Sequence, residues 1–336
     1  MFDLRMESVQ ALFYQPSYER LRERISHAAP DLDIVLIDED GKLSHHGQPV
    51  SPEQVNPQWF WIHSELFKTP VFPEYFRLMQ EVFNDVQWLH TINTGLDQGP
   101  YLALLRQGVR ISNNHSQAIA IAEYVMAHVL SHFHDLPAFA GNQAAGNWKY
   151  LRFRELCRTR WVIVGFGHIG QQVARRAKAF GVHVTAVRRS KGDADLADAV
   201  CQSDTMGEAL QAADVVVLAC ASNEATRDMV DACFLAQMKD DAVLVNIARG
   251  DLVVEEDLKA ALDAGRPGHA ILDVFREEPL PADAWFWFHP RVTLTPHCSN
   301  GGSGMRNRSD DLFLENLNRM SSGQRLLNAV SEKDIL

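Results

Sequence analysis

The chain has 336 residues, a net charge of −11 and apolar residues at 46% of its positions, as in a globular protein long enough for two domains. The negative charge argues against nucleic-acid binding, and no stretch approaches the roughly 18 apolar residues of a membrane helix. A first segment without signal-peptide features, and five cysteines without a CxxC pair, predict a cytoplasmic protein with reduced thiols.

Short apolar segments alternate with helical patterns in the first third of the chain. The predicted strands are residues 33–38, 59–62, 87–91 and 108–113. Such alternation is typical of a parallel sheet with helices on both faces. A long helix is predicted from Ser116 to His132. Because this helix is apolar on most faces, we expect it to be deeply buried or to form an oligomer contact.

A second alternating series begins after Trp148. Its predicted strands are residues 161–164, 182–187, 215–218, 243–247, 270–274 and 292–295. Six strands in this arrangement fit the doubly wound dinucleotide-binding fold. Near the carboxyl end, a glycine-rich link at 301–304 precedes a helix predicted over residues 305–320.

These patterns predict an α/β protein with two doubly wound parallel-sheet domains. A Rossmann cofactor domain, residues 116–298, is inserted in a flavodoxin-like substrate domain, which is formed by residues 1–115 and 299–336. We expect the ligands to bind in the cleft between the two domains, because domain interfaces are common locations for binding sites.

A GxGxxG loop follows the strand at 161–164. Gly165 makes the tight turn, Gly167 lets the backbone approach a pyrophosphate, and Gly170 lets the next helix lie close to the strand. That helix is predicted to begin near His168. The backbone N–H groups at His168 and Ile169, and the helix dipole, would then point at the phosphates. The alternative interpretation is a glycine turn that binds no ligand.

The strand at 182–187 ends in Arg188, Arg189 and Ser190. A cofactor without a 2′-phosphate favours an acidic residue at this place, to accept hydrogen bonds from the ribose hydroxyls. Arginine guanidinium groups suit a phosphate dianion instead. We therefore predict that the three residues contact the cofactor and that NADPH is preferred over NADH. The alternative is a basic loop end that only meets solvent.

From about residue 86 to its end, the chain resembles the D-isomer-specific 2-hydroxyacid dehydrogenases. Several stretches carry the resemblance: Val245–Gly250, Leu272–Pro281 and Leu294–His297, supported by Gly95–Asp97, Ala122–Glu123, Glu315–Leu317 and Gly323. Within that family the sequence is most similar to the glyoxylate/hydroxypyruvate reductases, mainly through the arginines that follow the second strand of the cofactor domain.

The resemblance implies a role for each of four residues. Arg249 would bind the substrate carboxylate and polarise the adjacent carbonyl, which its planar fork can do. His297 would be the general acid in reduction and the base in oxidation, since histidine titrates near neutral pH. Glu278 would hold the other imidazole N–H and stabilise the protonated ring. Asp273 would bind the nicotinamide carboxamide, with a simple cap at the strand end as the alternative.

The resemblance also implies a substrate-binding loop in the first domain. Backbone N–H groups of Thr94, Gly95 and Leu96 would bind the substrate carboxylate, because successive amides around a glycine form an anion site.

The resemblance also implies a contact between subunits. Trp287 lies where relatives carry a tryptophan that reaches the active site of a partner subunit; a buried aromatic cluster is the alternative. The apolar helix at Ala120–His132 and the aromatic loop at Trp285–Phe288 together predict a homodimer.

No metal site is predicted. His132 with His134, and His45 with His46, are the candidate pairs, but no carboxylate or cysteine lies at ligand spacing from either pair.

The predicted activity is the NADPH-dependent reduction of a small 2-oxoacid, glyoxylate or hydroxypyruvate, to the D-2-hydroxyacid. One alternative is a dehydrogenase for a bulkier 2-oxoacid. The other is a non-catalytic dinucleotide-sensing protein. Such a sensor would need only the glycine loop and not Arg249, Glu278 or His297.

Overall fold

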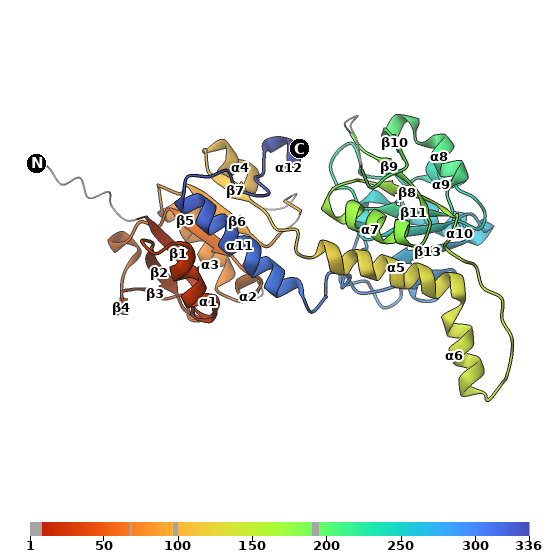
Figure 1. Cartoon of the computed structure of the whole chain (residues 1–336), viewed down its shortest axis with the longest axis horizontal. Coiled ribbons are helices and arrows are strands. Elements are labelled where there is room, and N and C mark those ends of the chain that lie inside the picture. The colour runs from red at the N-terminus through yellow and green to blue at the C-terminus, as the bar shows by residue number, and fades with distance from the viewer. Residues whose placement is uncertain (1–8, 68, 94, 97–99, 190–194, 336) are drawn as a thin grey trace, which may run out of the picture. The chain divides into compact units, whose positions relative to one another are not determined.

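The computed structural model describes residues 9–67, 69–93, 95–96, 100–189 and 195–335. The chain divides into two compact units, one formed by Met1–Ser116 with Gly304–Leu336 and the other by Gln117–Ser303. Each unit contains a seven-stranded sheet with helices packed against it (Figure 1). The two-domain α/β fold class predicted from the sequence is confirmed.

The first unit has its sheet in the order β4-β3-β2-β1-β5-β6-β7. Its strands are β1 (Gln10–Tyr14), β2 (Asp33–Ile37), β3 (Leu43–His45), β4 (Gln48–Pro49), β5 (Trp59–Ile62), β6 (Trp88–Thr91) and β7 (Arg110–Ser112). Five strands, in the order β2-β1-β5-β6-β7, are parallel and follow the flavodoxin-like order. The other two, β3 and β4, add an antiparallel hairpin at the β2 edge. The sequence patterns did not predict β1, which is central, or this hairpin.

Helices cover both faces of the first sheet. They are α1 (Gln15–Ala28), α2 (Ser64–Phe67), α3 (Phe72–Arg77), the π-helical turn Leu78–Val82, α4 (Tyr101–Arg106), α11 (Met305–Ser321) and α12 (Glu332–Ile335). The long helix α11 packs beside α1, and its Phe313 ring stacks on Trp61 of β5 with ring centroids 3.9 Å apart. Burial of this aromatic pair explains why the end of the chain returns to the first unit.

The second unit has a fully parallel sheet in the order β10-β9-β8-β11-β12-β13-β14. Its strands are β8 (Arg160–Val164), β9 (His183–Val187), β10 (Ala199–Cys201), β11 (Val215–Leu218), β12 (Val243–Asn246), β13 (His269–Leu272) and β14 (Val292–Leu294). This is the Rossmann order with one further strand. The sequence predicted six of these strands and missed β10, whose three residues are largely exposed and show no apolar run.

The helices of the second unit pack on both faces of its sheet. They are α5 (Ala118–His134), α6 (Leu136–Ala144), α7 (His168–Ala179), α8 (Gly207–Ala212), α9 (Ala232–Ala236) and α10 (Glu255–Ala264), with short 3₁₀ turns at Ser203–Thr205, Gly250–Leu252 and Trp285–Trp287. Within the described part of the chain, no helix is long and apolar enough to cross a membrane.

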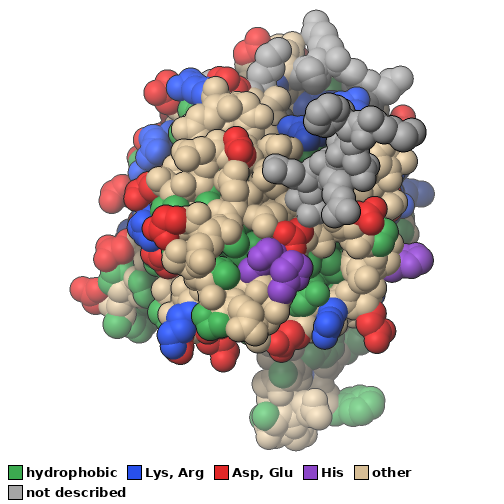
Figure 2. Space-filling model, turned by 90° about the vertical axis from the view of Figure 1, so that its left-hand side faces the viewer, with side chains coloured by type: hydrophobic (Ala, Val, Ile, Leu, Met, Phe, Trp, Pro, Cys, Tyr) green, Lys and Arg blue, Asp and Glu red, His purple; other side chains and the backbone are tan. Residues whose placement is uncertain are grey.

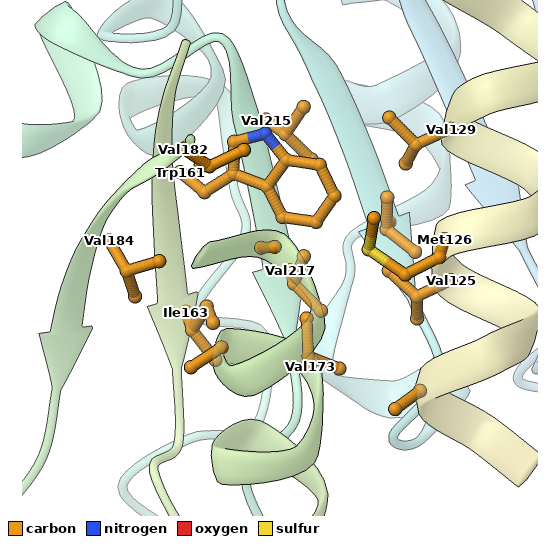
Figure 3. Close-up of a cluster of buried hydrophobic side chains, with 14 of the residues drawn as sticks. Val125, Met126, Val129, Trp161, Ile163, Val173, Val182, Val184, Val215 and Val217 are labelled. Atoms are coloured by element: carbon orange, nitrogen blue, oxygen red, sulfur yellow. The ribbon is translucent and has the colours of Figure 1, made fainter. Parts of the chain in front are cut away.

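The apolar helix α5 is a core element. Figure 3 shows Val125, Met126 and Val129 of α5 directed toward the side chains of the parallel strands, including the fully buried Trp161. The helix also packs along α7. Burial within its own unit, rather than an oligomer contact, therefore accounts for the apolar faces of this helix.

The exposed apolar side chains of this region lie instead in the segment that follows α5. We call residues 136–153 the α6 segment. Its exposed large side chains are Leu136, Phe139, Trp148, Tyr150 and Phe153. Figure 1 shows α6 pointing away from the remainder of the second unit.

Two histidines of the second unit are stacked in a largely buried position. His269 of β13 is 9% exposed, and its ring lies 4.1 Å from that of His132 on α5. His269 Nε2 lies 2.9 Å from Thr293 Oγ1. Burial lowers the pKa of His269 from 6.5 to about 4 and also lowers the pKa of His132.

This depressed pKa predicts a loss of stability in mild acid. The unfolded chain takes up a proton at His269 near pH 6.5, whereas the folded chain takes it up only near pH 4. The stability is therefore complete above pH 6.5 and is lost as the pH falls toward 4, by on the order of 3 kcal/mol. Urea unfolding over this pH range should show a shallower decline for His269→Phe, which keeps an aromatic ring. Equal slopes in both proteins would contradict the prediction.

Candidate active site

The predicted catalytic and cofactor-binding residues of the second unit lie at one edge of its sheet. The strands β8, β9, β12, β13 and β14 run parallel, so their carboxyl ends face the same way. Each of these strands is followed by a predicted site residue. Ligands of open α/β sheets bind outside such carboxyl ends.

The glycine loop has the geometry that its spacing predicts. Gly165 adopts a φ of +95°, and a Cβ at this position would lie 2.5 Å from the backbone nitrogen of Cys220. A Cβ on Gly170 would overlap the carbonyl oxygen of Gly165. The place where a Cβ of Gly167 would point is open, with no atom within 4 Å. Two glycines thus permit close packing, and Gly167 leaves room for a ligand.

Helix α7 begins at His168, directly after this loop. Its N-cap is Gly167, which has no side chain to accept a hydrogen bond from the first-turn amides. Those amides and the helix dipole favour an anionic ligand. His168 is exposed and Ile169 is half-buried, so the start of the helix reaches the surface.

The arginines predicted to contact the cofactor follow β9. The backbone N–H of Arg188 donates to Cys201 O at 3.1 Å, which fixes the strand end. Arg188 is half-buried and Arg189 is exposed, whereas Ser190 lies outside the described residues. Gly165 N donates to Val187 O at 3.0 Å, so the glycine loop is joined to the strand end that carries both arginines.

Asp273 organises the loop that follows β14. It is fully buried, and its Oδ1 accepts hydrogen bonds from Thr295 Oγ1 at 2.6 Å and Cys298 N at 2.9 Å. Its Oδ2 accepts a hydrogen bond from Ser299 N at 3.0 Å. Its carbonyl oxygen accepts one from His297 N at 2.8 Å. These are the contacts of a residue that caps a strand end, the alternative to the expected nicotinamide contact.

Tyr124 extends this network to helix α5, and no sequence motif predicted a role for it. Its hydroxyl lies 2.7 Å from Thr295 Oγ1, which in turn donates to Asp273. Burial raises the pKa of Tyr124, so the phenol stays protonated. A tyrosine on a largely buried helix was the available signal, because buried tyrosine hydroxyls usually have a partner.

His297 and Glu278 form the pair that the sequence predicts. His297 Nδ1 lies 2.7 Å from Glu278 Oε2, and Glu278 Oε1 accepts a hydrogen bond from Phe275 N at 2.9 Å. The carboxylate is therefore held on one side by backbone and on the other by imidazole. The His297 side chain is 45% exposed, so a small molecule can reach it.

The backbone of His297 is in the left-handed region, with a φ of +47°. Such a conformation disfavours a residue with a Cβ by about 1–2 kcal/mol. The hydrogen bond from His297 N to Asp273 O holds the backbone there. Strain of this kind is common at functional sites.

Arg249 is presented by a turn at the end of β12. Asn246 closes this turn, because its Nδ2 donates to Arg249 O at 2.8 Å and its Oδ1 accepts from Ala248 N at 3.1 Å. One guanidinium N–H of Arg249 donates to Ala248 O at 2.8 Å. A Cβ on Gly250 would overlap the backbone of Phe275. Glycine therefore lets the Arg249 turn lie against the loop that carries Glu278.

The remaining predicted residues, in the substrate loop and the aromatic loop, differ in how far they are buried. In the first unit, Gly95 is half-buried and the Leu96 side chain lies in the apolar core, whereas Thr94 lies outside the described residues. In the second unit, Trp287 is 46% exposed and its Nε1 donates to Pro281 O at 2.9 Å. Its neighbour Phe286 is buried against Phe275, so this loop is only partly a buried aromatic cluster.

Comparison with known proteins agrees with this architecture. Residues 126–299 match the family model described as D-isomer specific 2-hydroxyacid dehydrogenase, NAD binding domain. A solved D-isomer specific 2-hydroxyacid dehydrogenase family protein from Aeromonas salmonicida is 28% identical, with a TM-score of 0.76, and the likeness covers 97% of this chain and 99% of that one.

Two relatives are both named glyoxylate/hydroxypyruvate reductase A. Glyoxylate/hydroxypyruvate reductase A of Klebsiella pneumoniae (strain 342) is 33% identical over 52% of this chain and 56% of its own length, so the likeness spans little more than half of that protein. Glyoxylate/hydroxypyruvate reductase A HPR2 of Arabidopsis thaliana is 30% identical over 73% of this chain and 79% of its own length. The chain belongs to the family of D-isomer specific 2-hydroxyacid dehydrogenases, and its second unit contains their nicotinamide-dinucleotide-binding domain.

Proposed function

We propose that the chain reduces a small 2-oxoacid to the D-2-hydroxyacid with NADPH, and that glyoxylate and hydroxypyruvate are the favoured substrates. The pairing of His297 with Glu278, 2.7 Å apart and accessible to solvent, is the observation that carries the proposal. A dinucleotide-sensing protein would have no use for this pair. The names of the two relatives support the choice of a small substrate over a bulkier 2-oxoacid.

The residues of the second unit would divide the reaction between them. The glycine loop and the start of α7 would bind the cofactor pyrophosphate. The bound nicotinamide would supply the hydride for the carbonyl carbon. His297 would donate the proton to the carbonyl oxygen from Nε2, because Glu278 occupies Nδ1. Arg249 would bind the substrate carboxylate and polarise the carbonyl.

Two further roles belong to the proposal. The backbone amides at Thr94, Gly95 and Leu96 would supply a second anion contact for the substrate carboxylate. Asp273 would contribute by fixing the loop of His297 through its buried carboxylate. Asp273 would also contact the nicotinamide carboxamide, as the family resemblance implies.

The arginines after β9 predict the cofactor preference. Because Arg188 and Arg189 can bind a phosphate dianion, kcat/KM should be higher with NADPH than with NADH. Replacing both with glutamine should weaken NADPH binding by about 1.5–3 kcal/mol for each charge-assisted hydrogen bond that is removed. NADH binding should change little, which serves as the control. A wild-type preference for NADH in steady-state assays would overturn this part of the proposal.

The histidine–carboxylate pair predicts how the rate depends on pH. Glu278→Gln removes a negative charge beside the imidazolium and keeps the shape. Reduction of glyoxylate should therefore lose its rate at a lower pH than in the wild type. His297→Ala should lower kcat by about 10²–10⁴, the usual contribution of a general acid, with little change in cofactor affinity. An unshifted profile in Glu278→Gln would mean that the carboxylate only orients the ring.

The exposed aromatic side chains predict self-association. We propose that the chain forms a homodimer through the α6 segment, in which Trp148 is fully exposed and Tyr150 is 86% exposed. Patches of this kind are typical of protein interfaces. In such a dimer Trp287, 46% exposed, would be available to a partner subunit.

Sedimentation of the wild type at micromolar concentration should give about twice the mass of one chain. The double variant Trp148→Ser, Tyr150→Ser should sediment as a monomer. Phe180→Ser, which removes an exposed apolar side chain elsewhere in the same unit, should remain dimeric. A monomeric wild type would contradict the prediction and remove the proposed role of Trp287.

A further inference from the structure

We propose that Asp33, His45 and His46 form a binding site for a divalent transition-metal ion of the zinc type. The site lies at the hairpin edge of the first sheet, where β3 pairs with β2. It is separate from the proposed reductase activity, because none of the three residues is among those assigned to the cofactor, the substrate or the proton transfer.

The three side chains already approach the spacing of a metal site. His45 Nε2 lies 2.7 Å from Asp33 Oδ1, and His46 Nε2 lies 3.5 Å from the same oxygen. The three potential ligand atoms all lie within 4.8 Å of one another. Ligand atoms of a tetrahedral zinc ion are about 3.3 Å apart, given metal–ligand distances near 2.0 Å. Small rotations of the side chains would therefore be enough to accommodate the ion.

The turn between β3 and β4 brings the second imidazole to the site. His46 and Gly47 are its two central residues, with φ values of +48° and +76°. Two-residue hairpin turns with positive φ at both positions favour Asn-Gly, and here a histidine takes the place of the asparagine. The conformation places the His46 ring 4.0 Å from the His45 ring. Figure 2 shows exposed histidine side chains beside acidic side chains on the face that it presents.

The carboxylate is prepared to act as a ligand. Gln10 Nε2 donates to Asp33 Oδ2 at 2.8 Å, which orients the group from behind. Outer-shell bonds of this kind fix the ligands of metal sites.

The donor set selects the class of ion. Two imidazoles and one carboxylate suit zinc and its neighbours in the first transition series, and disfavour calcium and magnesium, which require mostly oxygen ligands. Three protein ligands leave at least one position for water. The sequence analysis considered the His45–His46 pair and rejected it for lack of a nearby carboxylate. The structure supplies that carboxylate, because the pairing of β2 with β3 brings Asp33 to the histidines.

Zinc titration of the full, chelator-treated chain tests the site. Isothermal titration calorimetry with ZnCl₂ should show one class of binding that His46→Asn weakens by at least about tenfold, since even loss of an outer-shell partner reduces affinity about 10–100-fold. His46 is 77% exposed, and asparagine is favoured at its positive φ, so this variant should keep the fold. Asp33→Asn, which keeps the shape of the carboxylate, should weaken binding similarly.

His183→Asn is the matched control, because it removes an exposed histidine of the other unit. It should bind zinc as the wild type does. Co²⁺ provides a second measurement: its visible absorption should appear in the wild type and the control and be lost in His46→Asn. Equal zinc affinity and stoichiometry in the wild type and His46→Asn, or no binding by the wild type, would overturn the proposal.

Discussion

The carboxylate of Asp273 is completely buried, and its two oxygens accept hydrogen bonds from Thr295, Cys298 and Ser299. A carboxyl group buried in this position without hydrogen-bond partners would be strongly destabilising. The loop after β14 must therefore close over Asp273 in one way. His297 lies within that loop and takes its left-handed backbone from it.

The same constraint reaches beyond the loop. Thr295 connects the carboxylate to Tyr124, so helix α5 is hydrogen-bonded to the segment that carries the proposed general acid. On the other side, Gly250 lets the Arg249 turn lie against the backbone at Phe275, whose N–H holds Glu278. The parallel pairing of β12, β13 and β14 brings these turns together at one edge. Packing and hydrogen bonding thus fix the positions of the three residues that the proposed chemistry needs.

The sequence predicted the parts of the fold that follow from repeated local patterns. The buried parallel strands are continuous apolar runs, so β11 was predicted with its observed bounds, and helix α5 was recognised from its length and composition. Strands without such a pattern were missed. The edge strand β10 is short and exposed, and β3 and β4 exist because they pair as a hairpin.

The candidate site shows the same division. The glycine loop was predictable because its motif is local, and the pairing of His297 with Glu278 was implied by the family resemblance. The contact of Tyr124 was not predictable, since it lies 171 residues from Thr295 in the chain. No sequence motif predicted the hydrogen bonds that Asp273 makes with the loop after β14. The cluster of Asp33 with His45 and His46 was missed because strand pairing brings its members together.

The central claim is that this site transfers a hydride and a proton to a 2-oxoacid. Incubation of the purified chain with NADPH carrying deuterium at both C4 positions of the nicotinamide, and with glyoxylate or hydroxypyruvate, tests it directly. Mass spectrometry should find one deuterium on carbon 2 of the hydroxyacid product, because the C–D bond formed by hydride transfer does not exchange with solvent. A product without deuterium, or no product from either acid, would contradict the account.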